Sequence, residues 1–166
     1  MNARSIARAL LGAALFLSPG HAQNPAGAPG ANPTHPVKYN LLGESVGLVS
    51  YDPVSYFPEG GGKPRKGLLK FSLAVDGVNY RFTSQQNLDR FAADRAKYPP
   101  AYGGWCAWAM GALGKRVDVD PESYLIRNGR LLVFYRDKDL DTRALWLADE
   151  ANLSRKAETN WASLNQ

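Results

Sequence analysis

The sequence is short of the side chains that most often carry catalysis and metal binding. Its 166 residues include one cysteine, Cys106, and two histidines, His21 and His35. A single cysteine excludes an internal disulfide, so Cys106 is a buried inert thiol, a ligand or a reactive redox group. Both histidines precede the patterned part of the chain, so a Cys–His catalytic pair is not expected. We therefore expect no catalytic residues and a non-enzymatic protein.

The sequence also lacks an apolar run long enough to span a bilayer. Residues 9–17 are apolar but short, they follow Arg4 and Arg8, and a helix breaker and small residues follow up to Ala22. This pattern is typical of a signal peptide over residues 1–22, cleaved after Ala22; an uncleaved anchor is the less favoured alternative. We expect a periplasmic or secreted protein with no membrane insertion after cleavage.

A strong excess of charge of one sign is missing as well. The formal net charge is +5, and the predicted signal peptide contributes two of these charges and no acid. A remaining charge of +3 makes a mildly basic surface, and it does not predict a nucleic-acid partner.

What the sequence does contain is one domain preceded by a linker. Residues 23–45 are rich in Pro, Gly and Ala, and Pro25, Pro29, Pro33 and Pro36 exclude regular structure there, so we interpret this segment as a flexible linker. Residues 46–166 have the hydrophobic patterning of a single domain.

Two hairpins and several helices are predicted within that domain. Residues 69–75 and 78–82 alternate apolar and polar around Asp76-Gly77, and residues 124–127 and 130–135 flank Asn128-Gly129. Both dipeptides are strong hairpin signals. Thr83 is predicted to cap a following helix. A short helix is expected near residues 105–113. The spacing of Leu140, Ala144, Leu147 and Ala151 predicts the buried face of a last helix. The predicted class is α+β, with helices packed on one small antiparallel sheet built from the two hairpins.

Three segments in this order resemble the YHS domain, and specifically its exported bacterial members. They are residues 51–57 (YDPVSYF), residues 80–84 with the later Phe91, and residues 102–109 (YGGWCAWA). Metal-associated members of the family have cysteines at positions that match Ser55, Thr83 and Asn87. These three side chains are poor ligands for soft metals, so the family's metal association does not transfer to this position.

The remaining candidate site surrounds Cys106. The resemblance suggests that the Asp-Pro turn lies near the short helix. A copper-like ion held by Cys106, Asp52 and Met110 is then one interpretation, because Met110 is four residues from Cys106 on the same helical face.

A small ligand in the same place is the second form of this hypothesis, with Tyr51, Asp52, Trp105, Cys106 and Trp108 as contacts. The sequence thus predicts an exported YHS-like binding module for a metal ion or a small ligand. The alternative is a structural or protein-interaction domain in which Cys106 is a core thiol. Exposure of Cys106 discriminates between the two.

Overall fold

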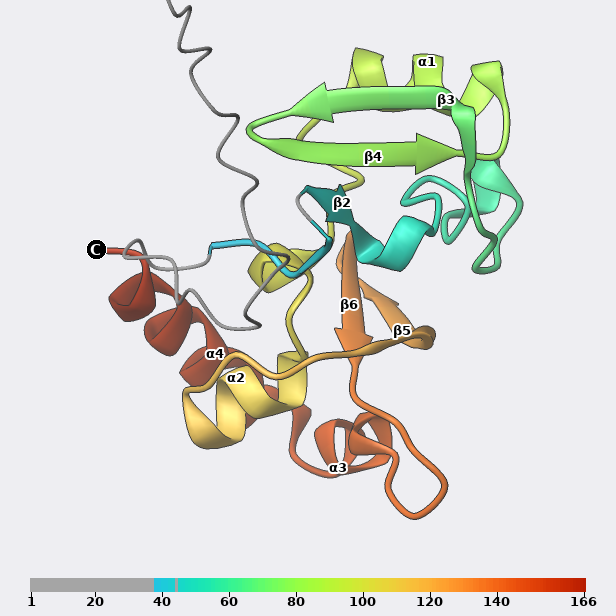
Figure 1. Cartoon of the computed structure of the whole chain (residues 1–166). Helices are drawn as coiled ribbons and strands as arrows, with labels where there is room; N and C mark the ends of the chain where they lie inside the picture. The colour runs from blue at the N-terminus through green and yellow to red at the C-terminus, as the bar shows by residue number, and fades with distance from the viewer. Residues whose placement is uncertain (1–37, 44) are drawn as a thin grey trace, which may run out of the picture. The chain divides into compact units, whose positions relative to one another are not determined.

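Two β-hairpins and four α-helices make up most of the described part of the chain, residues 38–43 and 45–166, in the computed structural model (Figure 1). The predicted α+β class is confirmed. The predicted signal peptide and most of the predicted linker lie outside the described residues. None of the helices in the described part has the length and hydropathy that a bilayer crossing requires.

The first hairpin joins β3 (Leu68–Val75) to β4 (Val78–Phe82), as predicted. Asp76 and Gly77 both have positive φ, 50° and 80°, which is the backbone that a type I′ turn requires.

Two short strands extend this hairpin to a four-stranded sheet in the order β1-β2-β4-β3. Strand β1 (Leu41–Leu42) pairs antiparallel with β2 (Val46–Gly47), and β2 pairs parallel with β4. Strand β1 lies within residues 23–45, so the end of the predicted linker belongs to the sheet. Two-residue strands are too short to leave a periodic signal in the sequence.

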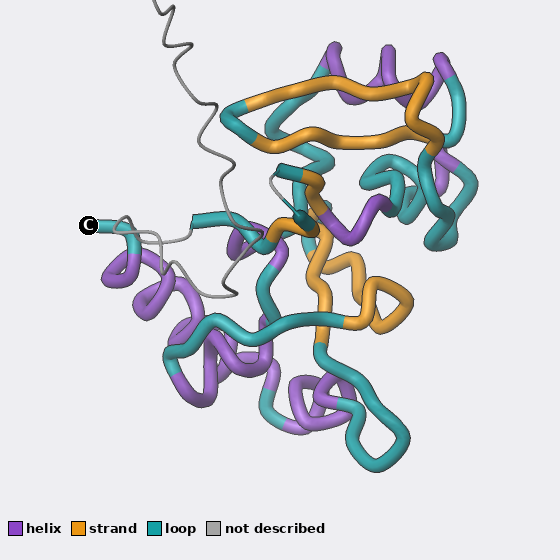
Figure 2. The backbone as a smooth tube through the Cα atoms, viewed as in Figure 1, coloured by secondary structure: helices purple, strands orange, loops and turns teal. Residues whose placement is uncertain are grey.

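The second hairpin, β5 (Asp120–Arg127) and β6 (Arg130–Phe134), is a separate two-stranded sheet (Figure 2). Its Asn128-Gly129 turn again has two positive φ angles, 51° and 75°. The two hairpins therefore do not share the one sheet that we predicted. The second hairpin is instead covered on both of its faces by side chains of other elements.

Strand β6 contributes to two hydrophobic cores. Leu131 and Val133 belong to a core with the first hairpin, whereas Leu132 and Phe134 belong to a core with the last helices. Successive side chains of a strand point to opposite faces, so four consecutive apolar residues indicate burial on both sides. The second hairpin thus separates the two cores and contacts both.

Helix α1 (Gln85–Ala93) follows β4 and packs on the first hairpin. Its N-cap is Ser84, whose hydroxyl accepts from the Asn87 backbone N–H at 3.2 Å. The prediction that Thr83 is the cap is wrong by one residue, because the Thr83 hydroxyl bonds the Asp52 carboxylate instead.

Three short 3-10 turns connect these elements: η1 (Leu48–Ser50), η2 (Pro58–Gly60) and η3 (Ala101–Gly104). The predicted short helix is α2 (Ala107–Leu113), which has Cys106 as its N-cap and ends at Gly114 in the left-handed region.

The predicted last helix is two helices, α3 (Thr142–Ala148) and α4 (Glu150–Leu164), which meet at Asp149. The four residues that we predicted to be buried, Leu140, Ala144, Leu147 and Ala151, are all exposed. Leu140 precedes α3, and the face of the two helices that points inward is offset by about two residues from the predicted face, so that Trp146 packs against Phe134. Trp146, Leu153 and Ala157 are buried in their place.

Helices α2 and α4 approach closely at Gly111. A Cβ atom at this position would lie 2.5 Å from the Leu153 backbone oxygen. Such a distance is a steric clash with backbone, which moves less easily than a flexible side chain.

We expect Gly111→Ala to destabilise the protein by about 1 kcal/mol on balance. Alanine improves helix propensity by about 1 kcal/mol, but overpacking costs about 1–3 kcal/mol. Urea unfolding measures the difference, and the exposed Ala112→Ser in the same helix is the control. Equal or higher stability of Gly111→Ala would show that α2 and α4 are not packed this closely.

Candidate functional site

The Asp52 carboxylate is fully buried and accepts five hydrogen bonds. The Val54 and Ser55 backbone N–H groups donate to Oδ1 at 2.8 and 3.3 Å. The Thr83 N–H, the Thr83 hydroxyl and the Asn87 amide donate to Oδ2 at 2.9, 2.8 and 2.7 Å. Among the described residues, none of the ion pairs includes Asp52. A buried carboxylate needs a hydrogen bond at each of its roughly four acceptor positions. The five donors around Asp52 meet this need without a positively charged partner.

The three positions that the family resemblance matches to cysteines all lie against this carboxylate. Ser55 donates its hydroxyl to the Asp52 backbone oxygen at 2.7 Å, and Thr83 and Asn87 contact the Asp52 side chain directly. Asn87 also donates to Thr83 Oγ1 at 3.1 Å. The polar groups of Asp52, Ser55, Thr83 and Asn87 are hydrogen-bonded to one another. This polar cluster therefore joins three chain segments.

The turn before Asp52 has an unusual backbone. Leu48, Val49 and Ser50 have φ angles of 50°, 51° and 68°, a region that residues with a Cβ rarely adopt. Each such residue costs about 1–2 kcal/mol. The surrounding contacts must offset this strain, and the hydrogen bonds of Asp52 begin two residues later.

Cys106 is buried, with 0% of its surface exposed. Its Sγ accepts from the N–H groups of Tyr135 at 3.3 Å and Ala109 at 3.5 Å. The Thr142 hydroxyl donates to the Tyr135 carbonyl at 2.7 Å, so the 3.4 Å contact between Sγ and Thr142 Oγ1 has the thiol as donor. These contacts are typical of a core thiol.

Cys106 and Asp52 do not form one site. The hydrogen-bond partners of Asp52 lie between residues 54 and 87, and those of Cys106 lie between residues 109 and 142. Met110 is fully buried in the second core. Within residues 38–43 and 45–166, no group of three or more His, Cys, Asp or Glu side chains is placed to hold a metal ion.

The aromatic candidates are separated as well. The Tyr51 hydroxyl donates to Glu122 Oε1 at 2.9 Å, and burial and this bond raise the pKa of Tyr51. Trp105 packs against the second core. Trp108 and Cys106 border an apolar hollow of about 200 Å³, although Cys106 exposes no surface to it.

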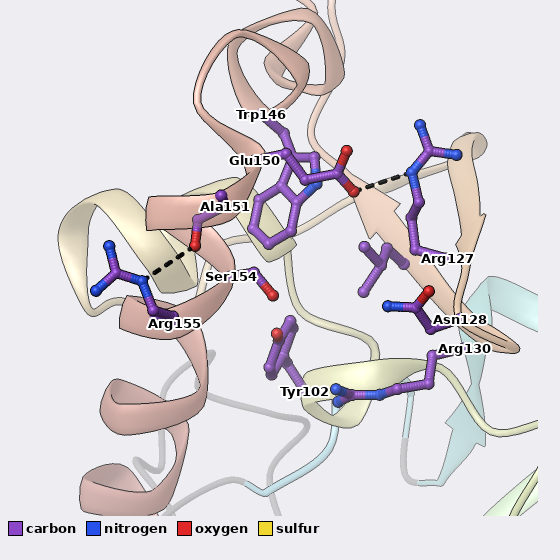
Figure 3. A pocket seen from close by; sticks show the side chains of 10 residues that line it. Tyr102, Arg127, Asn128, Arg130, Trp146, Glu150, Ala151, Ser154 and Arg155 are labelled. Atoms are coloured by element: carbon purple, nitrogen blue, oxygen red, sulfur yellow. Dashed lines mark hydrogen bonds and ion pairs between the residues drawn. The ribbon is translucent and has the colours of Figure 1, made fainter.

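A larger cleft of about 540 Å³ lies between the second hairpin and helices α3 and α4, and the sequence reasoning missed it (Figure 3). The hairpin contributes polar side chains at its turn, α3 contributes Trp146, and α4 contributes Ser154. The lining residues are Tyr102, Arg127, Asn128, Arg130, Leu132, Trp146, Glu150, Ala151, Ser154 and Arg155. The one available signal was a pair of arginines on either side of the Asn128-Gly129 turn.

The base of the cleft is formed by buried residues and its rim is basic. Tyr102, Leu132 and Trp146 are each buried, whereas Arg127 and Arg130 are exposed. Three arginines and one glutamate line the cleft, a formal charge of +2. Burial, followed by the hydrogen bond to Glu158, raises the pKa of Tyr102.

Comparison of the chain with known protein families, with curated proteins and with solved structures finds no match in any of the three. The likeness to the YHS domain therefore stays a prediction from the three motifs.

We expect Asp52→Asn to lower the free energy of unfolding by about 3–5 kcal/mol, because an amide nitrogen would face buried donors. The shift of the urea midpoint at unchanged slope measures this loss. Asp118 is exposed, so Asp118→Asn is the matched control and should change stability by less than about 0.5 kcal/mol. A similar small effect of both substitutions would contradict the network described above.

We expect the Cys106 thiol to be unreactive in the native protein. A chromogenic disulfide reagent should label it only after unfolding in guanidinium chloride, because attack requires access to the sulfur. Rapid labelling of the native protein would contradict its burial.

Proposed function

We propose that this chain is an exported, non-enzymatic module that binds a small ligand, and that its binding site is the cleft between the second hairpin and α3–α4. The observation that carries this proposal is the cleft itself. Its volume of about 540 Å³ falls within the range of about 300–1,000 Å³ that is usual for small-ligand sites. The N-terminal signal-peptide pattern supports export.

The composition of the cleft supports binding of an organic molecule. Ligand pockets typically combine apolar walls with a few polar groups that fix orientation. Here the buried Tyr102, Leu132 and Trp146 form the base of the cleft, and Asn128 and the arginines supply hydrogen-bond donors at the rim (Figure 3). The residues that line the cleft place hydrogen-bond donors around its base. No serine or cysteine among these lining residues is hydrogen-bonded to a base, which favours binding over catalysis.

The geometry favours a small organic ligand over a copper-like ion. Asp52 already accepts from five donors, and Cys106 is buried with its own partners. A metal would have to break both sets of hydrogen bonds before either side chain became a ligand.

A protein-interaction domain is the second candidate, and the hollow near Cys106 favours it. The lining of this hollow is mostly apolar and includes Leu113 and Leu140, whose side chains are 52% and 41% exposed. Exposed leucines around a hollow are a common feature of protein contact sites. The burial of Cys106 agrees with this alternative too.

The first test is a fragment screen by NMR with the exported protein. We expect small organic fragments to shift the Trp146 indole N–H signal in a saturable manner. Ser154→Leu places added bulk in the cleft and should abolish these shifts, because Ser154 lines it.

Ser163→Leu is the matched control, since Ser163 is exposed on the same helix outside the cleft lining. It should leave fragment binding unchanged. The proposal fails where no fragment binds, or where Ser154→Leu binds fragments as well as the wild-type protein. Fragments that shift only the signals of Leu113 and Leu140 would favour the protein-interaction domain.

A further inference from the structure

The chain that leads into β3, together with the start of that strand, carries four bases and no acid. Lys63, Arg65, Lys66 and Lys70 lie within eight residues, and the sequence from 60 to 75 contains no Asp or Glu. All four side chains are exposed, and none of them takes part in an ion pair within the described part of the chain. These charges are therefore available to a negatively charged partner.

Two adjacent leucines lie among these bases. Leu68 is 48% exposed and Leu69 is 73% exposed, the highest value among the large apolar side chains of the described residues. Exposed leucine side chains gain hydrophobic free energy only when a partner removes them from water. Residues 63–70 thus combine unpaired bases with uncovered leucines, and we call them the basic-leucine segment.

A bulge carries part of this segment out of the sheet. Leu68 pairs with Phe82 and Ser72 pairs with Arg81, so residues 69–71 are extra on β3. Strand β3 is also at the edge of its sheet (Figure 1). A bulge and a lysine on an edge strand oppose pairing with a further strand. A second copy of the chain or an extended peptide is therefore a poor partner for this edge.

The backbone of the basic-leucine segment is held by the turn around Asp52. The Lys63 N–H donates to the Ser55 carbonyl at 2.8 Å. The Asp52 N–H donates to the Arg65 carbonyl at 2.9 Å. The bases are presented from a fixed backbone, so less conformational entropy is lost when a partner binds them.

Two of the lysines lie over aromatic rings. The Nζ atom of Lys66 lies 5.9 Å from the centre of the Tyr51 ring, and that of Lys70 lies 4.9 Å from the centre of the Phe71 ring. Lysine can lay its aliphatic stem along apolar surface while its ammonium group stays in water. The Tyr51 hydroxyl also donates to Glu122, which places one acid near Lys66. The other bases are therefore the better ones to test.

We infer that the basic-leucine segment binds the surface of an anionic lipid bilayer. Its bases contact the negatively charged headgroups, and Leu68 and Leu69 enter the boundary between headgroups and acyl chains. The leucines distinguish a bilayer from a soluble polyanion, which offers no apolar phase. The contact is peripheral and reversible, and no part of the chain crosses the bilayer in it. This inference goes beyond the proposed function and does not depend on the cleft.

The test is cosedimentation of the exported protein with lipid vesicles, because an uncleaved signal peptide would itself bind lipid. Vesicles of phosphatidylglycerol and phosphatidylcholine in about equal amounts are compared with vesicles of phosphatidylcholine alone. We expect the anionic vesicles to bind at least about tenfold more tightly. This binding should be lost when the salt concentration rises from about 0.1 M to about 1 M, because the Debye length falls from about 10 Å to about 3 Å.

Two variants separate the contribution of the charges from that of the leucines. Lys63→Gln/Arg65→Gln removes two unpaired charges and should weaken binding to the anionic vesicles at least about tenfold. Leu69→Ser should weaken it about tenfold, because the exposed leucine no longer enters the apolar boundary. Leu69→Ser should leave binding to heparin, a soluble polyanion, unchanged.

Lys115→Gln/Lys156→Gln and Leu147→Ser are the matched controls, because these side chains are exposed and lie outside the basic-leucine segment. Both should bind the anionic vesicles like the wild-type protein. An equal loss in the charge control overturns the inference, and so does the absence of binding to anionic vesicles. Vesicle binding that Leu69→Ser leaves unchanged also overturns it and favours a soluble polyanion. None of these outcomes bears on the cleft, because the fragment screen tests the proposed function separately.

Discussion

The buried Asp52 carboxylate is the interaction on which the first half of the fold depends. It joins the turn at residues 52–55 to the end of β4 and the first turn of α1 through Val54, Thr83 and Asn87. A buried carboxylate without partners is very unfavourable, so these segments are stable only when they are assembled together. This requirement also explains how the strained left-handed turn at Leu48–Ser50 persists beside it.

The second hairpin has the corresponding role in the other half. Because β6 is apolar on both faces, it belongs to two cores at once, and its turn is left at the edge of the second one. That placement brings Arg130 over the Tyr102 ring and pairs Arg127 and Arg130 with glutamates of α4. The cleft is a consequence of this packing: the strand is buried along most of its length, and only its polar turn reaches solvent.

The burial of Cys106 changes where ligand chemistry is expected. Cys106 is the only cysteine of the sequence, and we therefore considered it first as a ligand. A residue that occurs once need not be exposed, and a free cysteine is commonly a core residue. The three N–H and hydroxyl contacts of its sulfur come from α2, from Tyr135 just after β6, and from α3. Cys106 therefore stabilises the junction of these elements, whereas the functional proposal concerns Tyr102 and residues 127–155.

The sequence by itself determined the features that depend on local backbone geometry. Asp76-Gly77 and Asn128-Gly129 predicted both hairpins, since positive φ at two successive residues is a property of the residues themselves. Only the tertiary structure decided the rest. The partners of Asp52 are up to 35 residues away, the cleft combines a hairpin with helices, and the buried face of the last helices is offset by about two residues from the face that the sequence pattern predicted. Periodicity indicates which side of an element faces inward, but it carries no information on which two elements meet.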